Sequence, residues 1–332
     1  NNSELMVDPI FQDPELQAKF ESQGYVKIPF LTQEEVTYLV ELFWKLHPNL
    51  DTKGFQSSSY SSDYGYKKNA SDLVTAVFKP HYERIFKNYR AFGSAYLYKQ
   101  PDTYSELPVH QDWTIVDEEK YVALNIWVPL IDVTSFNGAL HVMPGSHYGV
   151  LKPLRCPTLP MFFDGYEQLM IDNSIPMEVK AGEAVVLNQS IVHYSPPNKS
   201  DKIRIAITSG VMSAAPKMNF HYCPDRSKNE VEVIEMEDDF LISFENFYEA
   251  ILKRPLMGKS LGFKPYTIPL LNEDELKDIL LKMKERAGLP PILAESSPVK
   301  SNVVVEEKTA MAPPQKAAPS LLQRIASFFQ KH

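Results

Sequence analysis

The sequence has little cysteine, no long apolar run and no dense cluster of basic residues. Its 332 residues include two cysteines, Cys156 and Cys223, which are too few for a disulfide framework, and we expect two free thiols in a reducing cytoplasm. No segment approaches the roughly 20 apolar residues that span a bilayer. Residues 1–5 lack the basic and apolar regions of a signal peptide. We therefore expect a cytoplasmic protein without a membrane span.

Charge and glycine patterns argue against two further classes of protein. The formal net charge is −8 and no basic stripe is present, so we expect no nucleic-acid partner. The glycine-rich signatures of dinucleotide and phosphate-binding loops are also absent. Hydrophobic residues make up 44% and charged residues 23% of the chain, which is ordinary for a folded protein.

Strand-like segments dominate the middle of the chain. They recur at short spacing from Ala95 to Val211 with Gly, Pro and Asn between them, a pattern typical of a sandwich or jelly roll. Before them, residues 13–24 and 32–46 read as capped helices on either side of a strand at 25–29, and residues 72–90 read as a helix. We predict a mainly β fold with flanking helices.

The segment 51–72 is polar and reads as a long loop. Such a loop is either a lid over a functional site or a surface excursion, and the sequence does not decide between them. Its tyrosines, Tyr60, Tyr64 and Tyr66, could contact a substrate.

Toward the C-terminus, three successive segments, 222–293, 294–319 and 320–332, differ in composition from the strand-rich part of the chain. We predict a first domain at 1–221 and, at 222–293, a helical extension with helices over 238–252 and 273–287. We expect a disordered Pro/Ala-rich linker at 294–319. Residues 320–332 form a short amphipathic pattern, and a helix of that length needs a docking partner, which could be another protein, the first domain or a membrane surface.

One pattern in the sequence indicates a metal site. His110 and Asp112 are two residues apart in a segment, 107–116, that reads as a strand, so their side chains share a face while Gln111 and Trp113 point away. His193 ends a β-branched run that begins at Ala184. Two imidazoles and one carboxylate form the facial triad that binds Fe(II). We predict that His110, Asp112 and His193 are the metal ligands and the catalytic centre.

The remaining histidines are not expected to bind the metal. None has a carboxylate two residues away in a strand context, and they lie mostly in helices, turns or loops: His47, His81, His141, His147, His221 and His332.

The order of these motifs resembles the phytanoyl-CoA dioxygenase family of Fe(II)/2-oxoglutarate-dependent oxygenases. The resemblance covers roughly residues 15–215. It is carried by four motifs: H-Q-D-W at 110–113, N-G-A-L-H-V-M-P-G-S-H at 137–147, H-Y-S at 193–195, and an arginine eleven residues past His193. It implies a double-stranded β-helix, the jelly-roll core also found in cupins, and it implies iron(II), 2-oxoglutarate and O2 as cofactor and co-substrates.

The resemblance also assigns the residues that bind the co-substrate. Arg204 would hold the distal carboxylate of 2-oxoglutarate, since a guanidinium can donate two hydrogen bonds to one carboxylate. Ser195 matches the serine of the family's H-x-S motif, and Trp127 matches a tryptophan that lines the co-substrate pocket. Asn125 shares a strand face with Trp127, and Tyr98 and Lys99 could also face the cavity.

The reaction expected from this resemblance is hydroxylation of an unactivated C–H bond with release of succinate and CO2. Asp112 fills the coordination position that related halogenases leave open for chloride, so we do not expect a halogenase. The substrate is expected to be a small or medium metabolite. An acyl-CoA or carrier-tethered substrate is the alternative, and a catalytically silent jelly-roll binding module is an alternative of another class.

Overall fold

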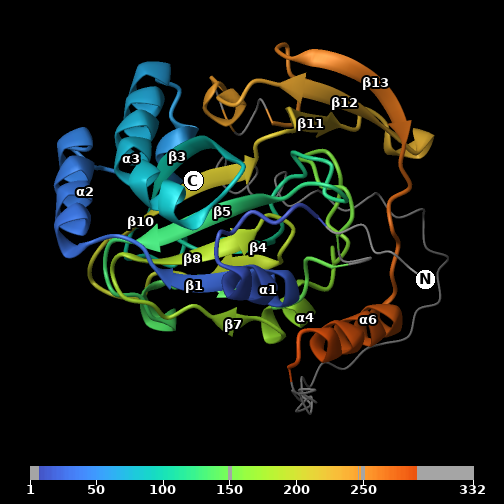
Figure 1. Ribbon diagram of the computed structural model, residues 1–332, viewed down its shortest axis with the longest axis horizontal. Coiled ribbons are helices and arrows are strands. Elements are labelled where there is room, and N and C mark those ends of the chain that lie inside the picture. Colours follow the sequence, from blue (N-terminus) through green and yellow to red (C-terminus); the bar gives the residue numbers. More distant parts are fainter. Residues whose placement is uncertain (1–6, 149–151, 246, 248–250, 290–332) are drawn as a thin grey trace, which may run out of the picture.

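Two facing antiparallel sheets form the centre of the protein. The computed structural model describes residues 7–148, 152–245, 247 and 251–289. The larger sheet has the order β1 (Tyr25–Pro29), β8 (Glu183–Asn188), β5 (Ala123–Pro129), β10 (Arg204–Ser213), β3 (Tyr89–Lys99) and β2 (Phe55–Ser57). The smaller sheet has the order β4 (Leu107–His110), β9 (His193–Ser195), β6 (His141–Val142) and β7 (Ile175–Pro176). This arrangement confirms the mainly β, jelly-roll core (Figure 1).

Three helices belong to the N-terminal half of the chain, namely α1 (Pro14–Gln23), α2 (Gln33–Leu46) and α3 (Tyr64–Ile85). The first two have the expected bounds because their caps are formed. Asp13 caps α1, and Thr32 and Glu35 form the capping box of α2. Apolar residues of α2 and α3 pack on the outer face of the larger sheet, as Figure 1 shows for the helices.

Alternation along β5 shows how the larger sheet divides the core. Ile126 and Val128 belong to the apolar cluster under the helices, whereas Trp127 belongs to the cluster between the two sheets. Successive side chains of a strand point to opposite faces. The odd-numbered positions of β5, Asn125 and Trp127, therefore face the interior where the smaller sheet lies.

The segment 51–72 is not the long loop that the composition predicts. It contains β2, the 3-10 turn η1 (Ser58–Tyr60) and the start of α3, whose N-cap is Asp63. The helix expected at 72–90 therefore begins at Tyr64 and ends at Ile85. Tertiary contacts hold the segment in place, since the Ser58 hydroxyl accepts a hydrogen bond from the amide of Tyr96.

Two predicted strands are shorter than expected. The strand predicted at 107–116 ends at His110, and the run 184–193 divides into β8 and β9. A turn separates β8 from β9, because the Asn188 Oδ1 accepts hydrogen bonds from both the amide and the hydroxyl of Ser190. The smaller sheet is therefore made of short strands that are joined by turns.

The region 222–293 is helical only in part. β11 (Met218–Tyr222), β12 (Glu230–Met236) and β13 (Lys259–Pro265) form a third sheet, so the expected boundary at 221 falls inside β11. The helix predicted at 238–252 is wrong for the described residues, which form the 3-10 turn η5 (Phe240–Ile242) there. The alternation of glutamate with apolar residues along 230–236 was the overlooked strand signal.

The other predicted helix is confirmed as α6 (Glu273–Arg286), which packs with α4 (Glu167–Asp172) against apolar residues of the smaller sheet. Two further short turns are η2 (Ser135–Asn137) and η4 (Arg226–Lys228). The predicted linker at 294–319 and helix at 320–332 lie outside the described residues. Within the described part of the chain, no helix is long and apolar enough to cross a membrane.

Candidate metal centre

Strand pairing brings the three predicted metal ligands together. β4 pairs with β9 so that His110 lies directly opposite His193, and their ring centroids are 4.2 Å apart. Asp112 follows β4, and its Oδ1 lies 3.7 Å from the His110 Nε2 and 4.0 Å from the His193 Nε2. One ligand atom from each of the three residues lies within 4.8 Å of the others, close enough to bind one ion.

Hydrogen bonds fix the orientation of both imidazoles. The Nδ1 of His110 lies 2.7 Å from the carbonyl of Pro108, and the Nδ1 of His193 lies 3.0 Å from the carbonyl of Ile191. Because a carbonyl only accepts, each Nδ1 donates its proton and leaves the Nε2 lone pair free for a metal. Burial and the neighbouring His193 lower the pKa of His110 to about 4, so the ring is neutral at pH 7. Two imidazole nitrogens and one carboxylate suit Fe(II).

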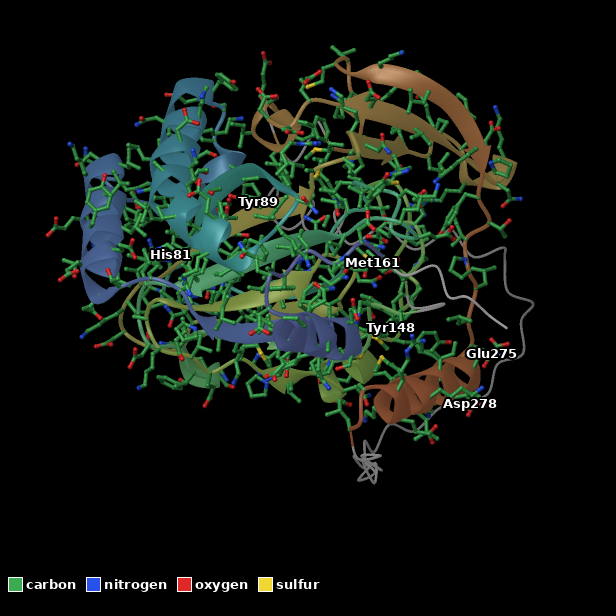
Figure 2. The ribbon with its side chains drawn as sticks, in the orientation of Figure 1. His81, Tyr89, Tyr148, Met161, Glu275 and Asp278 are labelled. Atoms are coloured by element: carbon green, nitrogen blue, oxygen red, sulfur yellow. The ribbon has the colours of Figure 1, made fainter. Side chains whose placement is uncertain are left out.

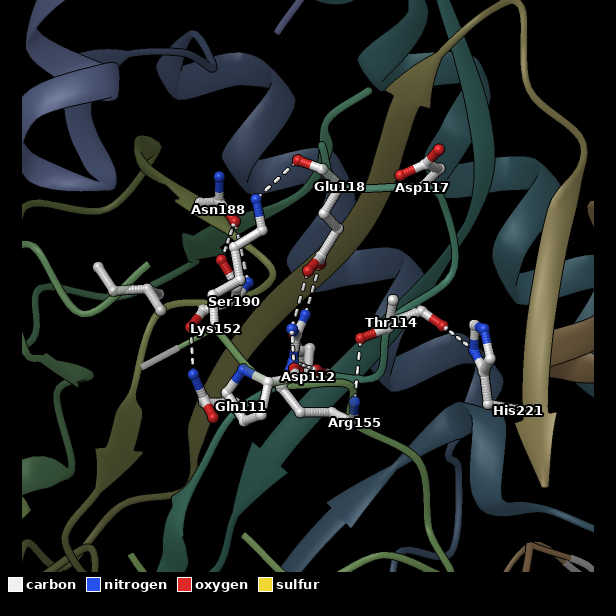
Figure 3. Close-up of polar contacts among 12 residues, drawn as sticks. Gln111, Asp112, Thr114, Asp117, Glu118, Lys152, Arg155, Asn188, Ser190 and His221 are labelled. Carbon is white, nitrogen blue, oxygen red and sulfur yellow. Dashed lines mark hydrogen bonds and ion pairs between the residues drawn. The ribbon is translucent and has the colours of Figure 1, made fainter. Parts of the chain in front are cut away.

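Arg155 holds the loop that carries Asp112 (Figure 3). Its Nε donates to the Asp112 carbonyl at 2.7 Å, and its two terminal nitrogens donate to the carboxylate of Glu118 at 2.9 and 2.5 Å. The backbone of Arg155 also exchanges hydrogen bonds with Thr114. The Arg155 side chain is 2% exposed. Sequence reasoning missed this residue, because nothing in its neighbourhood marks it as a partner of Asp112.

Gln111 and Trp113 do not point away from the site, as a regular strand would require. Since β4 ends at His110, the alternation of side chains is lost beyond it. The Gln111 amide donates to the carbonyl of Ser190 at 2.6 Å, and both Gln111 and Trp113 line the cavity beside the ligands.

Arg204 is buried with unused hydrogen-bond donors. It begins β10, is 1% exposed, and its Nε and one Nη have no hydrogen-bond partner in the described part of the protein. Its guanidinium carbon lies 5.6 Å from the centroid of the Trp127 ring, a cation–π arrangement. Burial lowers the pKa of Arg204. A buried cation with free N–H groups fits the distal carboxylate of 2-oxoglutarate.

Lys99 lies opposite Arg204 in the pairing of β3 with β10, and it is fully buried. Its ammonium donates to the carbonyls of Ser195 and Pro196 at 2.9 and 2.7 Å, which fixes the end of β9. Burial and the charge of Arg204 hold the pKa of Lys99 well below its usual range. Two neighbouring buried cations favour an anionic ligand at this end of the site.

The remaining residues that were predicted to contact the co-substrate or the cavity are Asn125, Ser195 and Tyr98. The Asn125 amide lies 3.4 Å from the Asp112 Oδ2, and its carbonyl accepts a hydrogen bond from the Thr208 hydroxyl. Ser195 is buried on β9, two residues beyond His193. Tyr98 does not face the interior, because it packs against Phe43 under α2.

A cavity of about 260 Å³ lies beside the metal ligands. Tyr60 is the tyrosine of the 51–72 segment that lines it, and burial together with the charge of Asp112 raises the pKa of this phenol. Tyr66 instead forms a hydrogen bond with His47, and the Tyr64 hydroxyl donates a hydrogen bond to Asp239.

The other described histidines are held by backbone carbonyls or, for His81, by a carboxylate. These pairs are His47–Phe43, His81–Glu35, His141–Ala139, His147–Glu21 and His221–Thr114. None belongs to the metal cluster found among the described residues, and His332 lies outside them. Figure 2 shows His81 near α2, where it contacts Glu35.

Comparison with known proteins gives the same family as the motifs. Residues 20–206 match the family model of phytanoyl-CoA dioxygenase (PhyH). The chain is 30% identical over 151 residues to phytanoyl-CoA dioxygenase 1 of Oryza sativa subsp. japonica, covering 45% of this chain and 51% of that protein. It is 36% identical over 130 residues to phytanoyl-CoA dioxygenase domain-containing protein 1 of Bos taurus, covering 37% and 44%. The chain thus spans about half the length of the curated relatives it matches.

Among solved structures, the fold is similar to that of SnoK, described as a non-heme alpha-ketoglutarate-dependent carbocyclase from nogalamycin biosynthesis. The TM-score is 0.50 at 21% identity, over 63% of this chain and 86% of that one. At this identity the likeness concerns the fold alone.

Proposed function

The chain belongs to the phytanoyl-CoA dioxygenase family, and on this basis we propose that it is an Fe(II)- and 2-oxoglutarate-dependent dioxygenase. We propose that it hydroxylates an unactivated C–H bond of a small or medium metabolite, with release of succinate and CO2. The observation that carries this proposal is the combination of the His110–Asp112–His193 cluster with Arg204, a buried cation that keeps two nitrogens unpaired in the described structure.

In the proposed mechanism, iron bound with 2-oxoglutarate and O2 supplies the oxidising chemistry. The protein contributes position and charge. His110 and His193 present their Nε2 atoms, and Asp112 presents a carboxylate that Asn125 contacts. Arg204 binds the distal carboxylate of the co-substrate through the donors that it has free.

The cavity beside the ligands would hold the substrate and exclude water. Its lining includes Trp113, Phe92 and Ile115, and it adjoins His110 and Asp112. An apolar enclosure strengthens the interactions of charged groups within it and keeps competing water away from the reacting atoms. The carboxylate of Asp112 would occupy one coordination position of the iron, which favours hydroxylation over halogenation.

An anaerobic titration of the metal-free protein with Fe(II) and 2-oxoglutarate tests this proposal. We expect a visible charge-transfer band in the wild type that weakens in Asp112→Ala and in Arg204→Met. The control is Arg254→Met, which removes an arginine that is paired with Glu232 outside the site. Absence of the band in folded, iron-loaded wild type would overturn the co-substrate assignment and favour a silent binding module.

A further inference from the structure

We infer that the part of the substrate bound in this cavity is an uncharged, largely apolar ring system carrying one hydroxyl or N–H donor, which Gln189 recognises. This inference rests on the proposed function, because it assigns the cavity beside the iron ligands to the substrate. Three observations carry it, namely the charge of the cavity lining, a stack of aromatic rings beside the cavity and one unpaired buried acceptor.

The cavity offers no counter-charge to an anionic substrate. Among the described residues that line it there is no lysine, arginine or glutamate, and the acidic and imidazole side chains in the lining are those of the predicted metal ligands Asp112 and His110. The two buried cations nearby, Arg204 and Lys99, are not part of the lining. Burying a carboxylate or phosphate without a partner is costly, so a charged group is disfavoured here.

Three nearly parallel rings, those of Tyr60, Phe247 and Trp113, stack on one another beside the cavity. The Phe247 ring lies 4.5 Å from that of Tyr60 at an interplanar angle of 23°, and 6.0 Å from that of Trp113 at 12°. Phe220 packs edge-on against Trp113 at 5.6 Å and supports it from behind. A ring of the substrate can pack against the outer face or the edge of this stack, and such aromatic pairs gain more than their buried area alone provides.

Gln189 supplies the polar recognition. Its backbone amide donates to the carbonyl of Ala123 at 3.1 Å. This bond fixes the residue just beyond β8, where it lines the cavity. The residue is 6% exposed, and its Oε1 has no hydrogen-bond partner among the described residues. A buried acceptor is rarely left without a donor in a folded protein. A hydroxyl or N–H group of the substrate would satisfy it.

Calorimetric binding of three probes of similar shape tests this inference: 2-naphthol, 2-methylnaphthalene and 2-naphthoate. Each is titrated anaerobically into the wild-type protein loaded with Fe(II) and 2-oxoglutarate. We expect 2-naphthoate to bind at least about tenfold more weakly than 2-naphthol, because its charge has no partner. Binding of 2-naphthoate as tight as that of 2-naphthol would overturn the assignment of an uncharged substrate.

Gln189→Leu tests the donor, and Gln168→Leu on the surface of α4 is its matched control. In Gln189→Leu the affinity of 2-naphthol relative to 2-methylnaphthalene should fall by up to about tenfold, the effect of one lost hydrogen bond. The ratio should not change in Gln168→Leu. An unchanged ratio in Gln189→Leu would overturn the role of Gln189.

The same samples distinguish a failure of the proposed function from a failure of the proposed substrate class. The charge-transfer band reports the iron and co-substrate complex before any probe is added. A missing band contradicts the proposed dioxygenase, whereas a normal band combined with preferred binding of 2-naphthoate contradicts the substrate class alone.

Discussion

Replacing Arg155 with methionine should weaken metal binding without removing any metal ligand. Arg155 links the Asp112 carbonyl, at 2.7 Å, to the Glu118 carboxylate, and it does so from a buried position. Because β4 ends at His110, no strand pairing holds Asp112 in place. Loss of groups that orient metal ligands typically lowers metal affinity 10- to 100-fold. This corresponds to about 1.4 to 2.7 kcal/mol of binding free energy.

The substitution also affects folding, and the two effects must be measured separately. Removing Arg155 leaves Glu118, which is 12% exposed, without its guanidinium partner. Breaking such a buried pair destabilises a protein by about 3 to 5 kcal/mol. The matched control is Arg254→Met, which breaks the ion pair with Glu232, a carboxylate that is 6% exposed in the third sheet. Both variants should unfold at lower denaturant concentration than the wild type.

Calorimetric titration with Fe(II) under anaerobic conditions distinguishes the variants. Arg155→Met should bind the metal 10- to 100-fold more weakly than the wild type, whereas Arg254→Met should bind it normally. Arg155→Lys should restore part of the affinity, because its ammonium can still donate to the Asp112 carbonyl. Equal affinity in Arg155→Met and the wild type would refute the argument that this side chain positions Asp112.

Three further predictions follow from the site and its surroundings. Arg204→Met should weaken 2-oxoglutarate binding more than about a hundredfold, because charge-assisted hydrogen bonds to the carboxylate are lost. The affinity for Fe(II) should not change, and equilibrium titrations with Fe(II) and then with 2-oxoglutarate measure the two affinities. Burial lowers the pKa of His147 to about 4. The folded state is therefore not penalised by this residue above its ordinary pKa of 6.5, and the protein loses stability as the pH falls from 6.5 toward 4. At pH 5 the loss is about 2 kcal/mol, and urea unfolding at pH 7 and 5 should show a smaller difference in His147→Gln. Gly210→Ala should destabilise the protein by about 1 to 3 kcal/mol, because a Cβ at this position would lie 2.0 Å from the Phe92 ring; thermal unfolding that is unchanged would contradict this packing.

The clustering of His110, Asp112 and His193 could be predicted from the sequence because its signal is local. Two strand-like segments carry the right residue types. Although β4 ends early and a turn separates β8 from β9, His110 and His193 still lie opposite each other. The helices at 14–23 and 33–46 were predictable for the same reason, since their caps lie within four residues of the helix start.

Features that depend on distant partners could not be predicted. Segment 51–72 is rich in polar residues, yet its structure depends on pairing with β3 and on a hydrogen bond to Tyr96. Arg155 is separated by 43 positions from the carbonyl that it binds. In the third sheet, β13 could not be predicted because its residues are exposed throughout, whereas β12 carried an alternation that was overlooked.

The pairing of β4 with β9 has a consequence for how the protein folds. His110 and His193 are 83 positions apart in the sequence, and the described part of the chain has its two cysteines as free thiols. An ion that joins these two strands closes a long loop, as a disulfide would. The chain-entropy model assigns such a closure on the order of 4 kcal/mol. Iron would therefore act as a reversible cross-link, and the concentration of free metal would affect the stability of the folded protein as well as its chemistry.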